Sequence, residues 1–375
     1  MSANAPTARR GFTRGDVFLI LLAAAAVLAC AAWLKPHDAG CDDDGCRFEG
    51  WVGDEFSQEV RELSETRPVF SLARPGEIPG TRAGDDVDLR TVNVRLWEPL
   101  KNYLGRHPPL VPQEVGDCVG QGWATAIETH LGVNAARGFG VFREVHPSFV
   151  YGLSRAVAKE RLAPEAYARF IRGDGSLGAL AAEAVTRGVL RLEGPAIPEY
   201  SGDVSRQWGG PGGPPAALLD QAEMSVVRTT AKIPDARSAA IAVANGYPVA
   251  ICSKLGFSRV READGRLVGV RDKTWHHCMA VTGFDGTAGR SGYFYFQNSW
   301  PVSAEPLFGA EPLQGEPPGG FWVTFEDVEV ALAESPSDTF AVSAFDGFPP
   351  LETDFHFLGL GPRRGPPDTL TVLAS

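Results

Sequence analysis

The sequence predicts an α+β protein with two lobes, in which a helical lobe precedes a lobe of antiparallel strands in a barrel-like arrangement. Apolar residues recur with helical spacing in the first half of the globular region, and short strand-like runs follow in the second half. Helices that precede strands, rather than alternating with them, are typical of an α+β protein. An uncharged apolar run near the N-terminus adds a transmembrane helix in front of both lobes.

Three segments have the apolar periodicity of helices: residues 120–133, 147–159 and 177–187. The first places Trp123, Ala124, Ile127 and Leu131 on one stripe. The third is ended by Gly188, a common helix terminator. Residues 209–215, GGPGGPP, then break the chain, and we expect them to form the crossover between the lobes.

Four later runs, bounded by Gly and Pro and rich in aromatic and branched residues, predict strands: residues 248–253, 277–284, 293–297 and 321–325. No internal repeat is visible. The chain has 375 residues, of which 44% are hydrophobic and 22% charged, so it can bury a sizeable core and is not a disordered protein.

Residues 17–34, VFLILLAAAAVLACAAWL, carry no charge and are just long enough to span the hydrocarbon core of a bilayer. Arg9, Arg10 and Arg14 precede the run, and basic flanks remain on the cytoplasmic side. We therefore expect residues 1–16 to be a cytoplasmic tail, residues 17–34 a membrane anchor or uncleaved signal, and the rest of the chain extracytoplasmic. A secreted form and a form lipid-anchored at Cys30 are the alternatives.

The chain after the anchor divides into three predicted parts. Residues 35–105 predict a stalk, a propeptide-like segment or a segment that wraps the next domain. Residues 106–345 predict the globular domain, and residues 346–375, which are rich in Pro and Gly, a C-terminal tail. An oxidising compartment permits disulfides, and Cys41 and Cys46 are the best candidate pair because a short loop with an Asp-Gly turn separates them.

Several classes of site are excluded by the residues. A net charge of −11 argues against a nucleic-acid binder, which needs a basic face. The chain contains no P-loop and no Cys-x-x-Cys, and Asp174 replaces the first Gly of a serine-hydrolase elbow around Ser176. A metal site made by Cys118, His276, His277 and Cys278 is disfavoured, because adjacent strand residues point to opposite faces. We expect no metal and no cofactor.

What remains is one Cys at a helix start, with His and Asn far downstream. Cys118 stands where the unpaired N–H groups of a helix favour a thiolate. His277 opens an apolar strand, and Asn298 ends the next strand, so an antiparallel return brings the two together. Each residue alone is more often structural, but the order Cys, His, Asn in these contexts is much more specific.

These segments resemble the papain-like cysteine peptidase family. The resemblance is carried by HHCMAVTGF at 276–284, YFYFQNSW at 293–300 and IAVANGYPVAI at 241–251, and also by GDGSLGALAAEAVTRGV at 173–189 and GGFWVTFEDV at 319–328. Together they span roughly residues 108–335. The sequence around Cys118, GDCVG, is similar to the GSCVG form of divergent bacterial members. The resemblance implies the papain-like two-lobed fold.

The resemblance also implies a role for each matching residue. Cys118 would be the nucleophile, His277 the proton carrier and Asn298 the residue that orients the ring, with Trp300 shielding their hydrogen bond. Gln113 would help to bind the oxyanion, although it stands five residues before the Cys where the family has six; Gln121 is the weaker choice. Substrate would contact the residues Gly175, Ser176, Cys252 and Cys278.

Two features of the resemblance to the papain-like family leave alternatives open: the position of the nucleophile, and the state of Cys252 and Cys278. If Trp123 and Ala124 align with the family's Trp-Ala, Gly122 occupies the nucleophile position and the chain is inert. Cys252 and Cys278 would line a small, largely apolar pocket that favours medium apolar side chains, and we expect them not to be bridged, because a bridge would stiffen the pocket wall.

The sequence therefore predicts a membrane-anchored, extracytoplasmic cysteine peptidase that acts on peptide or protein substrates. A catalytically inert peptide-binding module of the same fold is the alternative from another class. Acyl transfer with the same residues is the second alternative, because only the acceptor differs from hydrolysis.

Overall fold

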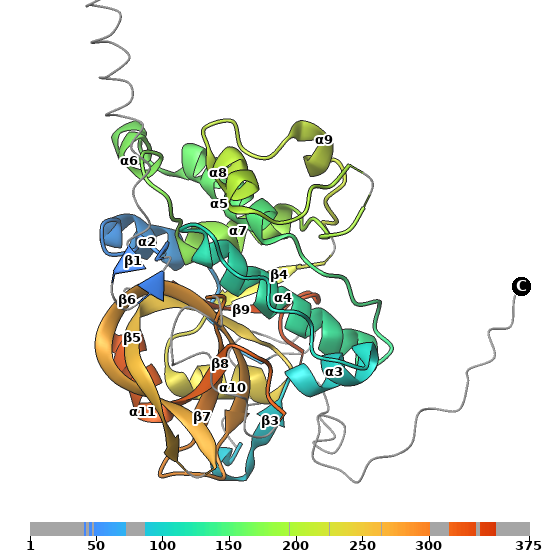
Figure 1. Cartoon of the computed structure of the whole chain (residues 1–375), viewed down its shortest axis with the longest axis vertical. Coiled ribbons are helices and arrows are strands. Elements are labelled where there is room, and N and C mark those ends of the chain that lie inside the picture. Colours follow the sequence, from blue (N-terminus) through green and yellow to red (C-terminus); the bar gives the residue numbers. More distant parts are fainter. Residues whose placement is uncertain are drawn as a thin grey trace, which may run out of the picture.

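A computed structural model of the chain describes residues 49–72, 87–194, 196–224, 226–263, 265–300, 315–334 and 338–349, together with the backbone of 41–42 and 45–46. Most helices gather on one side of the molecule and the strands on the other, with α4 running between them (Figure 1). The predicted α+β architecture of helices and an antiparallel sheet is confirmed.

The helices are α2 (Ser57–Glu65), α3 (Trp97–Leu104), α4 (Cys118–Ala136), α5 (Pro147–Arg161), α6 (Pro164–Phe170), α7 (Gly178–Arg187), α8 (Gly202–Gly209), α9 (Ala216–Leu219), α10 (Ala236–Ala244) and α11 (Phe325–Glu334). The strands are β1 (Cys41–Asp42), β2 (Gly45–Cys46), β3 (Asn93–Arg95), β4 (Thr229–Lys232), β5 (Val249–Ala263), β6 (Arg266–Asp285), β7 (Tyr293–Gln297), β8 (Gly320–Thr324) and β9 (Asp338–Ser343).

The three helices predicted in the first half are present as α4, α5 and α7, and α4 begins two residues earlier than expected, at Cys118. α5, α7 and α8 pack around an apolar cluster that includes Phe149, Leu180 and Trp208, and α4 contacts α5 beside it. The expected crossover at 209–215 is wrong: this stretch joins α8 to α9, and the first strand of the large sheet begins only at Thr229. The Gly and Pro residues there end one helix before another begins, rather than separating the lobes.

The large sheet has the order β4-β9-β5-β6-β7-β8, with β3 added against β6. All of its pairings are antiparallel except one contact between β6 and β8. The first four residues of β7 are aromatic and buried because both faces of the strand are covered: Phe294 and Phe296 belong to the main core, and Tyr293 and Tyr295 to a smaller cluster around Trp97. The four predicted strands overlap β5, β6, β7 and β8, although β5 and β6 are much longer than expected and Phe325 begins α11 instead of ending a strand.

α4 lies against β6, which positions the predicted site. A Cβ added to Gly122 would stand 3.0 Å from the backbone carbonyl of Cys278, so a larger residue would require the helix or the strand to shift by a few tenths of an ångström. The residues between the two halves, among them Trp123, Ala250 and Phe340, form a fourth apolar cluster. The first turn of α4 is thereby fixed beside the centre of β6.

The N-terminal part of the described chain packs onto the domain that follows it. α2 contacts α7, and Phe56 and Val60 enter the helical cluster. Phe70 donates its backbone N–H to the Lys232 carbonyl at the edge of β4, and β3 pairs with the end of β6. Residues 49–72 and 87–104 therefore wrap both halves of the molecule.

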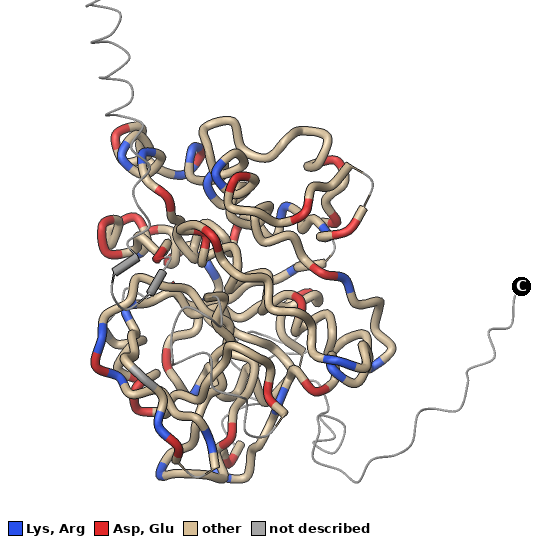
Figure 2. The backbone as a smooth tube through the Cα atoms, viewed as in Figure 1, with Lys and Arg blue, Asp and Glu red and all other residues tan. Residues whose placement is uncertain are grey.

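The predicted membrane anchor at 17–34 lies outside the described residues. Within the described part, we find no helix with the length and apolar character needed to cross a bilayer. Cys41 and Cys46 face each other across the β1–β2 hairpin, but their side chains are not described, so their disulfide stays a prediction. Basic and acidic positions are interspersed along the chain in the view of Figure 2.

Candidate active site

Cys118 is the first residue of α4, and its side chain is completely buried. Its Sγ lies 4.0 Å from the carbonyl oxygen of His276. Burial raises the pKa of the Cys118 thiol far above its usual range, and the charge of the preceding Asp117 adds to this effect. In this arrangement the sulfur is held as a thiol.

His277 and Asn298 form the predicted pair. The ring Nε2 of His277 lies 2.7 Å from Oδ1 of Asn298, which also accepts the backbone N–H groups of Ser299 and Trp300. An amide oxygen only accepts hydrogen bonds, so Nε2 carries the proton of the neutral ring. The other nitrogen, Nδ1, is buried and has no hydrogen-bond partner among the described residues.

The surroundings of His277 are apolar. The ring of Trp300 lies over it with centroids 4.4 Å apart, and Trp275 approaches it edge-on. Burial lowers the pKa of His277 to about 4, although the hydrogen bond to Asn298 alone would raise the pKa. The imidazole is therefore neutral at pH 7, and Nδ1 presents a lone pair.

The two predicted reactive groups lie on adjacent elements, since α4 contacts β6 at Cys278, the residue after His277. Within the described chain, no hydrogen bond joins the Cys118 thiol to the His277 ring. His276 points elsewhere: its half-exposed ring contacts Glu49 and Asp54. Of the two adjacent histidines, His277 is thus the one that Asn298 holds.

Gln113 is buried and tied to the loop that follows Asn298. Its backbone N–H donates to the Ser299 carbonyl at 2.8 Å, and its Oε1 accepts the Ser299 hydroxyl at 3.0 Å. Its Nε2 donates to the Val115 carbonyl at 2.6 Å. Gln121, the weaker choice, lies one turn inside α4.

The alternative that places Gly122 at the nucleophile position conflicts with the geometry. α4 begins at Cys118, and Gly122 lies one turn further on, packed against the backbone of Cys278. The position with unpaired helix N–H groups is occupied by a cysteine.

A short N-terminal stretch, residues 49–54, covers this region, and we call it the covering segment. The N–H groups of Gly50 and Trp51 both lie 3.0 Å from the His276 carbonyl. The Gly50 carbonyl accepts the Ser176 N–H at 2.8 Å, and Val52 donates back to the Ser176 carbonyl at 3.2 Å, which makes a parallel bridge. The covering segment therefore lies between β6 and the loop that precedes α7, next to Cys118.

The loop before α7, residues 173–177, allows the backbone of the covering segment to approach it closely. Gly175 has φ +103°, a conformation that favours glycine, and a Cβ there would stand 2.8 Å from the Gly50 carbonyl oxygen. The buried guanidinium of Arg155 donates to the carbonyls of Gly173 and Gly175 and holds the loop in place. The predicted substrate residues Gly175 and Ser176 thus contact a peptide, although it is the chain's own.

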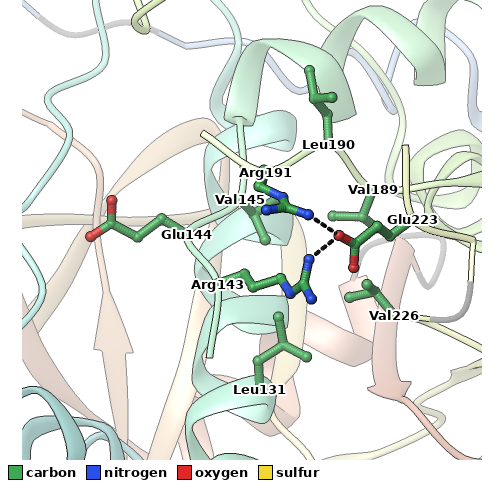
Figure 3. A pocket seen from close by; sticks show the side chains of 9 residues that line it. All are labelled: Leu131, Arg143, Glu144, Val145, Val189, Leu190, Arg191, Glu223 and Val226. Atoms are coloured by element: carbon green, nitrogen blue, oxygen red, sulfur yellow. Dashed lines mark hydrogen bonds and ion pairs between the residues drawn. The ribbon is translucent and has the colours of Figure 1, made fainter. Parts of the chain in front are cut away.

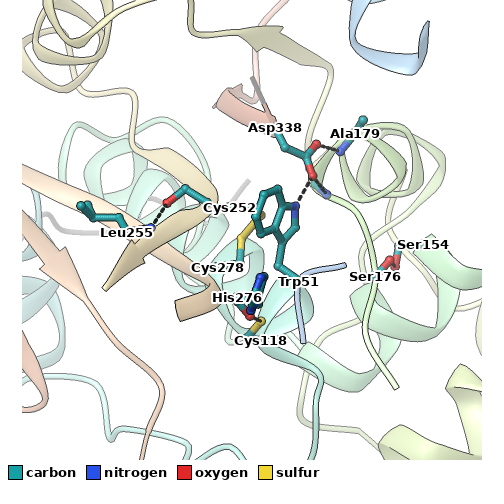
Figure 4. The surroundings of a disulfide bond; sticks show 12 residues. Trp51, Cys118, Ser154, Ser176, Ala179, Cys252, Leu255, His276, Cys278 and Asp338 are labelled. Atoms are coloured by element: carbon teal, nitrogen blue, oxygen red, sulfur yellow. Dashed lines mark hydrogen bonds between the residues drawn. A yellow bond between two sulfur atoms is a disulfide. The ribbon is translucent and has the colours of Figure 1, made fainter. Parts of the chain in front are cut away.

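Cys252 and Cys278 are bridged, which corrects the expectation that they are free thiols. They face each other directly across β5 and β6, with Cα atoms 4.0 Å apart, so the bridge needs no movement of the strands. The disulfide lies next to Trp51 and near Cys118 (Figure 4). Among the described residues, Cys118 is the free cysteine.

Two residues at this site were missed by the sequence reasoning. Asp338 faces Cys252 across β5 and β9, and its buried carboxylate accepts the indole N–H of Trp51 at 2.7 Å. The pocket beside the disulfide is therefore not purely apolar, as we expected. Trp51 and Asp338 are 287 positions apart, and no local motif marks either one.

A small surface pocket lies elsewhere, lined by residues that include Leu131, Val145 and Val226 (Figure 3). Arg143 and Arg191 both bind Glu223 there, so both cationic groups are already paired with the same carboxylate. None of the predicted site residues lines it.

The chain matches no protein-family model, and no curated protein matches it. Solved structures of cysteine proteases are similar to it. Xylellain from Xylella fastidiosa is 13% identical, with 75% of this chain and 98% of that chain covered and a TM-score of 0.43. Digestive procathepsin L 3 of Tenebrio molitor is 14% identical, with 77% of each chain covered and a TM-score of 0.38. Bromelain from Ananas comosus, in complex with the E64 inhibitor, is 12% identical, with 67% and 98% covered and a TM-score of 0.38.

Proposed function

We propose that this chain is a cysteine peptidase whose active site is closed by its own covering segment. The observation that carries the proposal is the bond from His277 Nε2 to Asn298 Oδ1, which leaves Nδ1 as a base without a partner. This base lies on the strand that packs against the helix start carrying Cys118. A thiol at a helix start beside a neutral, oriented imidazole is the arrangement that nucleophilic catalysis by Cys requires.

The proposed reaction begins with transfer of the Cys118 proton to His277 Nδ1 while the sulfur attacks a peptide carbonyl carbon. The carbonyl oxygen becomes an oxyanion, for which the backbone N–H of Cys118 and the side-chain amide of Gln113 are the proposed donors. His277 then gives the proton to the leaving amine as the C–N bond breaks. Water hydrolyses the resulting thioester and restores the thiol.

The closed arrangement slows this chemistry, because Cys118 is accessible only while the covering segment is displaced. Cys118 is buried under Gly50 and Trp51, and its desolvation keeps the proton on sulfur. Withdrawal of the covering segment admits water and substrate together, and solvation of the charged forms favours transfer of the proton from Cys118 to His277. We therefore propose that residues 35–105 include an inhibitory, propeptide-like segment.

A peptide epoxide that alkylates reactive thiols tests the proposal, with mass spectrometry to locate the adduct. We expect one adduct, on Cys118, in the full chain and none in Cys118→Ala. His277→Ala should label far more slowly, whereas His107→Ala, a histidine substitution outside the site, should label at the original rate. Hydrolysis of an unfolded protein substrate should follow the same order. Activity that survives in Cys118→Ala would refute the thiol mechanism.

We further propose that residues 17–34 anchor the protein in a membrane with the peptidase domain outside the cytoplasm. The support is the uncharged run preceded by three Arg residues. Protease added to intact cells should degrade the domain, and fractionation should recover the full chain with membranes. A domain that is protected in intact cells and free after lysis would contradict this topology.

A further inference from the structure

Trp51 is bound in the closed site as a ligand would be. Its side chain is only 1% exposed, although it belongs to the covering segment rather than to a helix or to the large sheet. Its ring stacks on His276, with centroids 6.4 Å apart, and its indole N–H donates to Asp338. The covering segment therefore shows what kind of side chain this place accepts.

The space that Trp51 fills, which would become a pocket if the covering segment left, is bordered by residues of the large sheet. Cys278, Cys252 and Asp338 are direct neighbours across β6, β5 and β9, so their side chains share one face of the sheet. The disulfide forms the wall beside Trp51, and the carboxylate lies at the end of the indole (Figure 4). Cys118 approaches the carbonyl of His276, two positions along β6 from Cys278, so the pocket adjoins the proposed nucleophile.

Trp51 supplies one of the three hydrogen bonds that the carboxylate of Asp338 accepts. It is fully buried and accepts three N–H groups: those of Gly178 and Ala179 at the start of α7, at 2.7 and 2.6 Å, and that of Trp51, at 2.7 Å. The first two belong to the helix and stay when the covering segment leaves. A buried carboxylate short of one hydrogen bond discriminates strongly for ligands that restore the bond.

We propose that Asp338 is a specificity-determining residue, and that the pocket selects substrates whose side chain has an apolar body ending in an N–H donor, tryptophan first. This inference rests on the proposed peptidase function and replaces the expectation of medium apolar side chains. The side chain would lie along the disulfide and donate to Asp338 in place of Trp51.

The test uses binding, so that it does not depend on catalysis. The full chain with Cys118→Ala and Trp51→Ala lacks both the nucleophile and the internal ligand. Two probes are compared by calorimetry: acetyl-tryptophanyl-glycine amide, and its benzothiophene analogue, in which sulfur replaces the indole N–H. We expect the indole probe to bind roughly ten times more tightly or better, as for other hydrogen bonds to a buried charge.

Substitution of Asp338, which forms the floor of the pocket, provides the second part of the test. Asp338→Asn in the same background should reduce the preference for the indole probe to within about twofold, whereas Asp346→Asn, which alters an exposed carboxylate just past β9, should retain it. Asp338 also accepts N–H groups at the start of α7, so a thermal melt is used to check that the Asp338→Asn variant is folded. The comparison of the two probes in the parent background does not depend on this variant. Equal affinity of the two probes, or no binding of either, would overturn the inference.

The two proposals can fail separately. If the indole probe is preferred but the epoxide does not label Cys118 in the Trp51→Ala chain, the proposed selectivity of the pocket is supported and the proposed peptidase function is rejected. If Cys118 is labelled and peptides are cleaved with no preference for tryptophan over its benzothiophene analogue, the peptidase stands and the role of Asp338 does not.

Discussion

Gly50 lies so close to Gly116 that a Cβ on Gly50 would stand 2.1 Å from the Gly116 carbonyl oxygen. The obstacle is backbone, which cannot rotate away as a side chain can. Substitution Gly50→Ala should therefore displace the covering segment from Cys118, and we expect epoxide labelling of Cys118 to be at least about tenfold faster, since a displacement worth 1.4 kcal/mol changes the open population by that factor. Glu55→Ala, an exposed change just past the segment, is the control. An unchanged labelling rate in Gly50→Ala would mean that the segment does not limit access.

His277 and Asn298 should contribute unequally to kcat. In the Gly50→Ala background, His277→Ala should lower kcat by roughly 10²–10⁴, the usual contribution of a positioned base. Asn298→Ala should lower kcat less, because the base remains but its ring is no longer held, and KM should change little in both variants. Steady-state kinetics on a fluorogenic peptide measures the order. A larger loss in Asn298→Ala than in His277→Ala would contradict the proposed roles.

Closure should depend on pH through Glu49 and His276. Burial alone would raise the pKa of Glu49, but the hydrogen bond and charge of His276 hold it below the ordinary 4.5. The same hydrogen bond raises the pKa of His276 above 6.5, against the effect of burial. The acid contributes above pH 4.5 and is lost as pH falls below it, whereas the histidine contributes below pH 6.5 and is lost as pH rises through its raised pKa.

The pair therefore closes the site most firmly between about pH 4.5 and 6.5. The ratio of Cys118 labelling rates, His276→Gln over the original chain, removes the intrinsic pH dependence of the thiol. We expect this ratio to peak in that window and to decline toward one on both sides. A ratio that does not vary with pH would show that these charges do not hold the segment.

The Cys252–Cys278 disulfide should contribute to stability. It closes a sequence separation of 26 residues, for which the loop-closure model gives about 3.5 kcal/mol. The double variant Cys252→Ala, Cys278→Ala should therefore melt roughly 7–14 °C lower, given the size of the domain. Differential scanning calorimetry with and without a reductant tests this, since a reductant should lower the melting temperature of the original chain only. Equal melting temperatures of the two chains would contradict the prediction.

The parts of the site that the sequence predicts are those with a local signature. Residues 293–296 form an uninterrupted aromatic run in a strand that ends just before Asn298, and His277 opens an apolar run that ends at a glycine. Cys118 was expected at the start of a helix because the periodic stripe begins just after it. In each case the residue and the element that positions it are neighbours in the chain.

The parts that could not be predicted depend on register. The disulfide follows from Cys252 facing Cys278, and the pocket floor from Asp338 facing Cys252; a shift of one residue in either pairing would send these side chains to opposite faces. The sequence around Asp338 has no motif, and Trp51 reaches it from a segment without regular structure. Burial of Trp51 depends on both halves of the molecule, which no local pattern encodes.

Asp338 also has a mechanical consequence. Its backbone belongs to β9 of the sheet, while its carboxylate holds the first two free N–H groups of α7 in the helical half. Neither bond involves an atom of the covering segment, so this link between the helical half and the sheet does not depend on Trp51. We therefore expect the covering segment to leave without a change in the separation of the two halves at this point.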